Sequence, residues 1–147
     1  FELIQSMIKS NKILNCEVIS DDIIKSHILQ KSIFAVSKSG TVSLEICKAK
    51  IPSVILYKMN FINYLIIKIL VKVKFANIIN IAAKEEIIPE LLQSNCNSKR
   101  IFNCVSNYID NPEKIREQVK KTQTVLDRFK TNKSSAEQAS FALNKYL

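Results

Sequence analysis

Residues 33–57 read IFAVSKSGTVSLEICKAKIPSVILY, and their pattern decides the fold. Two short apolar runs, at 33–36 and 52–57, predict strands, and residues 41–50 between them have the apolar spacing of a helix. Two strands joined through a helix form a βαβ crossover, in which the strands run parallel. Because the rest of the chain also alternates between helix and strand signals, we predict an α/β fold with a parallel sheet and helices on both faces.

Apolar spacing and capping residues predict the remaining elements. Helices are expected at 1–10, 63–71, 89–93, 98–109 and 112–129. Asp21 or Asp22 is expected to cap a helix that reaches about Gln30, and Ser134 with Glu137 has the spacing of a capping box that opens a last helix. Strands are expected at 16–19 and 75–79.

The chain carries a formal net charge of +9, which ordinarily suggests a nucleic acid or an anionic membrane as partner. Of the 22 basic residues, however, 19 are lysines, and they are scattered without interleaved arginine and aromatic residues. Lysine, isoleucine and asparagine are all abundant here and share A/T-rich codons, so base composition explains much of the excess. We therefore expect no nucleic-acid partner.

The four cysteines, Cys16, Cys47, Cys96 and Cys104, form no C-x-x-C pair, and His27 is the only histidine. This spacing matches no zinc or redox motif, so we expect neither a metal nor another cofactor. Cys47 and Cys104 lie among apolar residues in helical patterns and are expected to be reduced core residues. We assign His27 no role.

The most apolar stretch, residues 59–83, is interrupted by Lys68, Lys72 and Lys74. Its uncharged runs are shorter than the ~20 residues that a membrane-spanning helix needs. Residues 64–73 have two interpretations: a core-facing helix with solvated lysines, or a basic amphipathic surface at an anionic membrane. The first residues also lack the order of a secretory signal, so we expect a cytoplasmic protein with at most peripheral membrane contact.

Gly40, the only glycine of the chain, lies between an expected strand and an expected helix. A turn from the carboxyl end of a strand into a helix often needs a residue without Cβ. The new helix presents free N–H groups and the positive end of its dipole, which together bind phosphate. The hydroxyls of Ser39 and Thr41 would add two donors, and nucleotides bind at this edge of open α/β sheets.

Glu45 lies one turn into the same helix, on the face of Thr41. With Thr41 as the capping residue, Leu44 and not Glu45 has the spacing of a capping-box partner. The Glu45 carboxylate is therefore free to accept hydrogen bonds from a diol such as a ribose. The alternative is an acidic residue favoured only by the positive end of the helix, and the residues alone leave both interpretations open.

Several motifs occur in an order that resembles lipid-A-disaccharide synthases. Residues 39–45, SGTVSLE, are similar to the S-G-T-x-x-L-E of that family, and the residues from Tyr57 to Met59 are similar to its Y-[RK]-M. Asn80 corresponds to the asparagine of a P-N-L/I segment, and residues 88–93, IPELLQ, resemble V-P-E-L-L-Q.

The resemblance is clear over residues 33–93 and extends to the flanking helices in outline. Four positions depart from the family pattern. Ile79 replaces the proline before the asparagine, and Lys84 with Glu85 replaces a glycine-basic pair just beyond it. Phe61 also stands where a proline is common.

The resemblance implies a GT-B glycosyltransferase built from two Rossmann-like domains. Such an enzyme transfers an acylated glucosaminyl group from UDP-2,3-diacylglucosamine to lipid X and releases UDP, with inversion and without a metal. Residues 1–130 would be an incomplete C-terminal UDP-sugar-binding domain and residues 131–147 a C-terminal helix. The chain starts at Phe1 without an initiator methionine, and we expect the acceptor-binding N-terminal domain, with the acidic catalytic residue, to lie outside it.

By the same resemblance, the turn residues Ser39, Gly40 and Thr41 contact the diphosphate, Glu45 binds the ribose, and Asn80 lies near the nucleotide or the transferred sugar. Possible cleft-lining residues are Tyr57, Lys58 and Met59. For these three, packing at a strand end or a solvated surface is the alternative.

Two other functions also fit the sequence. One is another UDP-sugar enzyme of GT-B architecture, although such enzymes usually carry a glycine-rich turn and Gly40 is alone. The other is a basic, non-catalytic interaction module. If the chain is part of a lipid-A-disaccharide synthase, its acylated substrate favours peripheral contact with the anionic inner membrane. We expect the chain by itself to be inactive.

Overall fold

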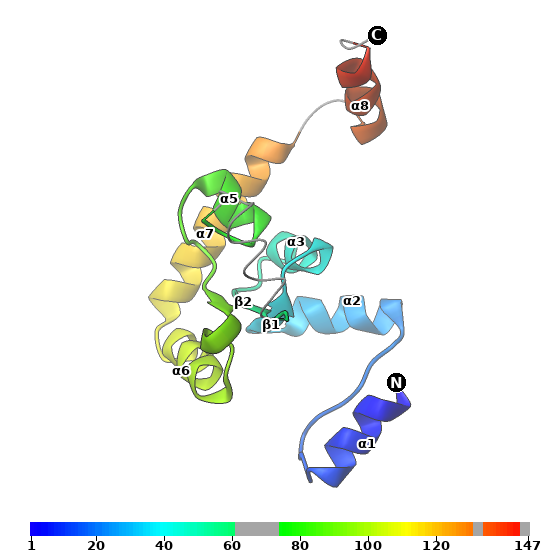
Figure 1. Ribbon diagram of the computed structural model, residues 1–147, viewed down its shortest axis with the longest axis vertical. Coiled ribbons are helices and arrows are strands. Elements are labelled where there is room, and N and C mark those ends of the chain that lie inside the picture. Colours follow the sequence, from blue (N-terminus) through cyan, green and yellow to red (C-terminus); the bar gives the residue numbers. More distant parts are fainter. Residues whose placement is uncertain (61–73, 131–133, 145–147) are drawn as a thin grey trace.

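The computed structural model describes residues 1–60, 74–130 and 134–144 (Figure 1). Within these residues, three strands form a parallel sheet in the order β1 (Ala35–Lys38), β2 (Ser53–Tyr57) and β3 (Glu90–Leu92). Val36 pairs with Val54, and Leu56 pairs with Leu91. The predicted α/β fold with a parallel sheet is therefore confirmed.

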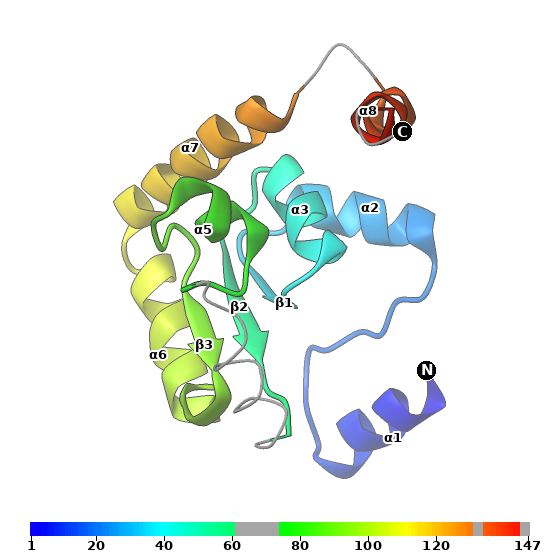
Figure 2. The ribbon, with the colours of Figure 1, turned by 45° about the horizontal axis from the view of Figure 1, so that its top comes forward.

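Some of the described helices pack beside this sheet and others lie apart from it (Figure 2). The described helices are α1 (Glu2–Ser10), α2 (Asp22–Lys31), α3 (Thr41–Lys48), α5 (Ile78–Ala83), α6 (Ser98–Ile109), α7 (Pro112–Phe129) and α8 (Ser135–Leu143), with a 3-10 turn η1 (Gln93–Asn95). The unit β1-α3-β2 is the crossover predicted from residues 33–57, with β1 two residues later than expected and α3 two residues shorter. The helix expected at 63–71 lies outside the described residues.

The capping residues act as the sequence predicted. One carboxylate oxygen of Asp21 accepts hydrogen bonds from the backbone N–H groups of Ile23 and Ile24, each at 2.9 Å, which fixes the start of α2. Ser134 and Glu137 form both bonds of the capping box at the start of α8. These local hydrogen bonds satisfy helix-end donors that would otherwise have no partner in the chain.

The apolar core lies between α3, β2, α5 and α7. Its buried members are Cys47, Ile55, Ile79, Ile87, Ile88 and Val125. Val54 and Ile55 point to opposite faces of β2 and are both fully buried, so the middle strand is covered on both sides. Burial raises the pKa of the Cys47 thiol to about 11, so this residue is neutral and packs as a small apolar side chain, as expected.

A buried glutamine joins α7 to the sheet. Gln118 accepts a hydrogen bond from the Ser53 N–H at 2.6 Å and donates to the Ser53 carbonyl at 3.1 Å. Its amide also donates to the Tyr108 hydroxyl at 3.1 Å. A buried amide needs such partners, and here they hold the start of β2 against α6 and α7.

The strand expected at 75–79 is wrong, because this segment turns into α5. Asn77 caps the helix, since its side-chain oxygen accepts a hydrogen bond from the Ile79 N–H at 2.9 Å. Ile79 is fully buried, whereas Ile78 and Ile81 are 48% and 40% exposed. This spacing is helical, and a run of apolar residues this short does not distinguish a strand from a buried helix.

The helix expected at 89–93 is also wrong, because these residues form β3. The Ile55 N–H donates to the Pro89 carbonyl at 2.9 Å, and Ile55 and Leu56 then pair with Glu90 and Leu91. Residues 90–92 adopt a strand because the backbone N–H and C=O groups on this side of the buried strand β2 need hydrogen-bond partners. Proline is tolerated at the start of this strand as well as of a helix.

The strand expected at 16–19 is not formed either. Cys16 and Glu17 are exposed, and no described residue pairs with the outer side of β1. Without a neighbouring strand, the backbone groups of this segment gain nothing from an extended pairing conformation.

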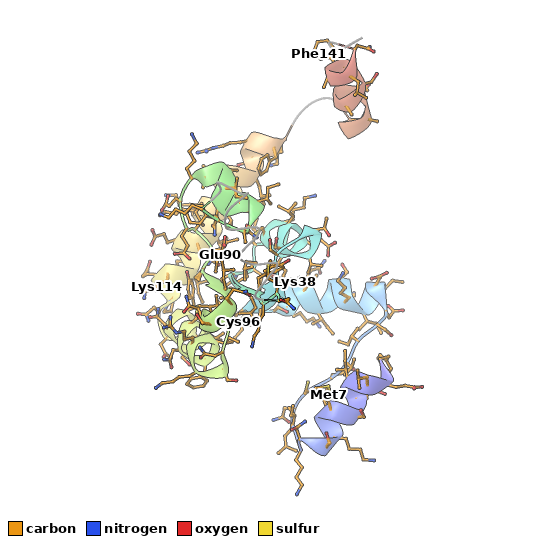
Figure 3. All side chains as sticks on the ribbon, in the orientation of Figure 1. Met7, Lys38, Glu90, Cys96, Lys114 and Phe141 are labelled. Carbon is orange, nitrogen blue, oxygen red and sulfur yellow. The ribbon has the colours of Figure 1, made fainter. Side chains whose placement is uncertain are left out.

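α1 and α8 lie apart from the sheet, as the positions of Met7 and Phe141 show (Figure 3). No residue of α1 or α2 is buried. Of the apolar residues of α1, Leu3, Ile4 and Met7 are each more than half exposed. None of the described helices is long and apolar enough to cross a membrane.

Candidate functional site at the carboxyl edge of the sheet

The turn from β1 into α3 has the backbone that glycine alone adopts readily. Gly40 has φ 146° and ψ −164°, in a region that residues with a Cβ rarely occupy. A Cβ at this position would meet no described atom within 4 Å, so the backbone conformation and not crowding requires glycine. The described residues thus leave space in which a ligand can approach the backbone of the turn.

Gly40, and not Thr41 as the sequence spacing assumed, is the capping residue of α3. No described side chain caps this helix, so N–H groups of its first turn have no side-chain acceptor in the described part of the chain. Thr41 is exposed at the first helical position. The Ser39 hydroxyl donates to the Ala76 carbonyl at 2.8 Å, so its proton is already used within the chain.

Glu45 projects from α3 with little to hold it. Its carboxylate lies 3.2 Å from the Lys25 ammonium of α2, and the two side chains are 51% and 44% exposed. Such a surface ion pair contributes only about 0–1 kcal/mol. Glu45 is the fifth residue of α3, beyond the first turn where the helix dipole acts most strongly, so the dipole alone is a poor reason for an acid here.

Two side chains from the strand ends face each other beside the turn. The ammonium of Lys38, the last residue of β1, lies 5.1 Å from the ring centroid of Tyr57, the last residue of β2. Cation–π contact at an exposed site contributes about 0.5–1 kcal/mol and holds the lysine at the sheet edge. Lys38 was not predicted as a site residue, although its position directly before Ser39 indicates that it lies at the same end of the strand.

Gln93 fixes the segment that follows β2. Its side-chain oxygen accepts a hydrogen bond from the Met59 N–H at 2.8 Å, and its amide donates to the Met59 carbonyl at 3.3 Å. Met59 is half-buried and Lys58 is exposed. The structure therefore brings Tyr57, Lys58 and Met59 to the same sheet edge as Gly40, as expected for parallel strands.

Asn80 lies inside the protein and not on its surface. Its side-chain oxygen accepts hydrogen bonds from the Ile87 and Ile88 N–H groups, both at 2.9 Å. Its amide donates to the Ile88 carbonyl at 2.7 Å and to the Glu90 carboxylate at 2.8 Å. Asn80 is 0% exposed and its polar atoms all have partners in the chain, so this geometry favours a positioning role over a ligand contact.

Glu90 is a second residue that the sequence analysis did not select. Its carboxylate accepts hydrogen bonds from the Ala76 N–H at 2.7 Å, the Asn77 N–H at 3.0 Å and the Asn80 amide at 2.8 Å. It thereby links β3 to the start of α5. No signal at short range identifies this role, because all three donors come from another segment.

Two cavities, of about 390 and 360 Å³, lie on the α7 side of the molecule. Both are lined by Ile87, Glu117 and Lys121, and neither is lined by a residue of the Gly40 turn. In the second cavity, burial and the nearby Glu86 carboxylate raise the pKa of the Cys104 thiol, so this half-buried cysteine is neutral. Within the described residues, no cluster of side chains could hold a metal ion.

Comparison with known proteins shows which family the chain belongs to. The family model described as lipid-A-disaccharide synthetase matches residues 2–144, from α1 to α8. The chain belongs to this family. The resemblance seen in the motifs at 33–93 is thereby confirmed and extended to the flanking helices.

Individual members of the lipid-A-disaccharide synthetase family agree with this match. The lipid-A-disaccharide synthase of Rickettsia conorii is 39% identical over 114 residues, which are 76% of this chain and 26% of that protein. The enzyme of Rickettsia felis is 41% identical over 102 residues, 68% of this chain and 26% of the relative. The enzyme of Rickettsia canadensis is 39% identical over 115 residues, which are 77% of this chain and 29% of that relative. The chain thus spans about a quarter of the length of the relatives it matches.

Proposed function

We propose that this chain supplies the donor-nucleotide site of a lipid A glycosyltransferase, and that the site binds UDP at the carboxyl edge of the sheet. The observation that carries the proposal is the Gly40 turn, whose left-handed backbone opens directly into the uncapped start of α3. Free N–H groups and the positive helix end provide a binding site for a diphosphate. The family match supports a glycosyltransferase of lipid A synthesis, and the geometry of the Gly40 turn supports UDP binding at this edge of the sheet.

The other residues of the edge have distinct proposed roles. Glu45 accepts hydrogen bonds from the ribose, since its carboxylate is held among the described residues only by an exposed lysine that a ribose can displace. Thr41 and the backbone of Ser39 and Gly40 contact the diphosphate. Lys38 adds a cation beside it.

For the whole enzyme, we propose the GT-B architecture and the transfer of an acylated glucosaminyl group from UDP-2,3-diacylglucosamine to lipid X. The acceptor and the catalytic acid or base then belong to a second, N-terminal domain. In this proposal, residues 1–130 belong to the UDP-sugar-binding domain, and residues 131–147 are the C-terminal segment that contains α8. The acylated substrates place the reaction at the inner face of the bacterial inner membrane.

The 147-residue chain by itself is expected to form no disaccharide from the UDP donor and lipid X, although it binds UDP. The reason is that a quarter of the enzyme cannot hold donor and acceptor together. A radiolabelled transfer assay checks this, with the Rickettsia conorii enzyme as positive control. Product formed by the chain alone would contradict the division of donor and acceptor sites.

Lys38→Met is expected to weaken UDP binding about threefold to tenfold, because it removes a charge-assisted contact to the diphosphate worth about 1 kcal/mol. Uridine, which lacks the diphosphate, should bind equally to both proteins. Lys99→Met, on the exposed surface of α6, changes the net charge equally and serves as the control. Equal UDP affinities for the Lys38 variant, the control and the wild type would exclude Lys38 from the site.

A further inference from the structure

A continuous run of hydrogen-bonded polar groups leads away from the Gly40 turn into the protein. The hydroxyl of Ser43, a fully buried residue of α3, donates to the Gly40 carbonyl at 2.6 Å. The same hydroxyl accepts a hydrogen bond from the side-chain amide of Asn77 at 3.0 Å. Asn77 is also fully buried, so water does not compete for these bonds.

The run continues to β3 through the backbone of two adjacent residues. The N–H groups of Ala76 and Asn77 both donate to the Glu90 carboxylate, at 2.7 and 3.0 Å. The Ala76 carbonyl in turn accepts the hydroxyl proton of Ser39, at 2.8 Å. Residues on both sides of Gly40 are therefore tied to the same two-residue segment, and that segment is tied to the sheet.

Helix capping does not account for this arrangement. Capping α5 needs only the side-chain oxygen of Asn77, which bonds the Ile79 N–H. Its amide is free of that task and bonds across to Ser43 instead. Ser43 then reaches the carbonyl of the one residue in the turn that has a left-handed backbone.

We propose that Ser43, Asn77 and Glu90, of which the first two are buried, form a hydrogen-bonded relay that holds the Gly40 turn in its diphosphate-binding conformation. This inference rests on the proposed function. The three residues touch no ligand themselves and are positioning residues. Because a site whose donors are fixed before binding does not lose freedom on binding, the relay raises affinity for the diphosphate but not for the nucleoside.

The test uses the fact that Gly40 is the only glycine in the chain. Labelling with ¹⁵N-glycine gives a single amide peak that reports on the turn, with and without UDP. Ser43→Ala should shift and broaden this peak and weaken UDP binding about tenfold, the effect of one lost hydrogen bond of good geometry, while uridine affinity stays within twofold. Ser53→Ala is the matched control, since Ser53 is equally buried but its hydroxyl has no partner in the described chain.

Asn77→Ser separates the relay from the folding of α5. Serine is also a good capping residue, so α5 should persist, but its hydroxyl is too short to bridge to Ser43. We expect the same change in the Gly40 peak as for Ser43→Ala. A Gly40 peak and a UDP affinity like those of the wild type in both variants would overturn the relay, as would equal losses of UDP and uridine binding. A wild-type peak that does not respond to UDP would instead refute the proposed function, while its response to Ser43→Ala still decides whether the relay holds the turn.

Discussion

Replacing Asn80 with alanine is expected to lower the free energy of unfolding by about 4 kcal/mol. The substitution leaves the buried N–H group and the carbonyl of Ile88 without their Asn80 partner, and the Ile87 N–H keeps only the Glu85 carbonyl, at 3.1 Å. Each such group costs about 1–3 kcal/mol, and the Glu90 carboxylate loses a donor as well. Urea denaturation followed by circular dichroism measures the change.

Asn103→Ala is the matched control for this substitution. Asn103 lies on the exposed surface of α6, and its replacement should change the stability by less than about 0.5 kcal/mol. If Asn80→Ala were as stable as this control and lost only UDP affinity, Asn80 would contact the ligand directly. The positioning role assigned to it would then be wrong.

Elements whose causes lie in nearby residues could be predicted from the sequence. Asp21 and the pair Ser134 and Glu137 cap their helices through bonds spanning two or three residues. The unit β1-α3-β2 was predictable because a single glycine separates an apolar strand from a helix. In each case the sequence signal and the stabilising contact occupy the same short window.

The elements that sequence reasoning assigned wrongly depend on distant partners. Residues 89–93 carry a proline and apolar spacing that suit a short helix, but the free edge of β2 makes β3 the better conformation. Residues 16–19 have strand-like composition, yet no described strand pairs with them. Local propensity is a weak guide where a neighbouring strand decides the conformation.

The residues of the candidate site also fall into those that local spacing predicted and those that depend on distant partners. Gly40, Thr41 and Glu45 were selected from local spacing, and the structure places them together at the sheet edge. The roles of Ser43 and Glu90 could not be read from the sequence, because their partners lie 34 and 10 to 14 residues away. Asn80 was selected by resemblance, and only its hydrogen bonds reveal that its side chain faces inward.

Glu45→Ala is expected to weaken UDP binding about 10- to 100-fold. A carboxylate that accepts hydrogen bonds from the ribose hydroxyls contributes roughly 1.5–3 kcal/mol, and truncation removes all of it. The melting temperature should change little, because the exposed Lys25 is the only ion-pair partner of Glu45 in the described part of the chain. If Glu45 merely complemented the dipole of α3, the substitution would cost about 0.3–1 kcal/mol of stability and leave UDP affinity alone.

Lys25→Ala controls for the ion pair. It breaks the same contact to Glu45 but leaves the carboxylate in place, so UDP affinity should stay within about twofold of the wild type. A loss of affinity equal to that of Glu45→Ala would show that the ion pair, and not a ribose contact, explains the effect.

Calorimetric titration of the wild-type chain with UDP is the direct test of a donor site at the Gly40 edge. We expect saturable binding of one UDP per chain that persists as the salt concentration rises and weakens by one to two orders of magnitude in Glu45→Ala. Binding of polyanions in general to a basic surface would instead weaken steeply with salt and ignore the substitution. No saturable UDP binding by a folded chain, or the same UDP affinity with and without the Glu45 carboxylate, would contradict the assignment of the Gly40 edge as the donor site.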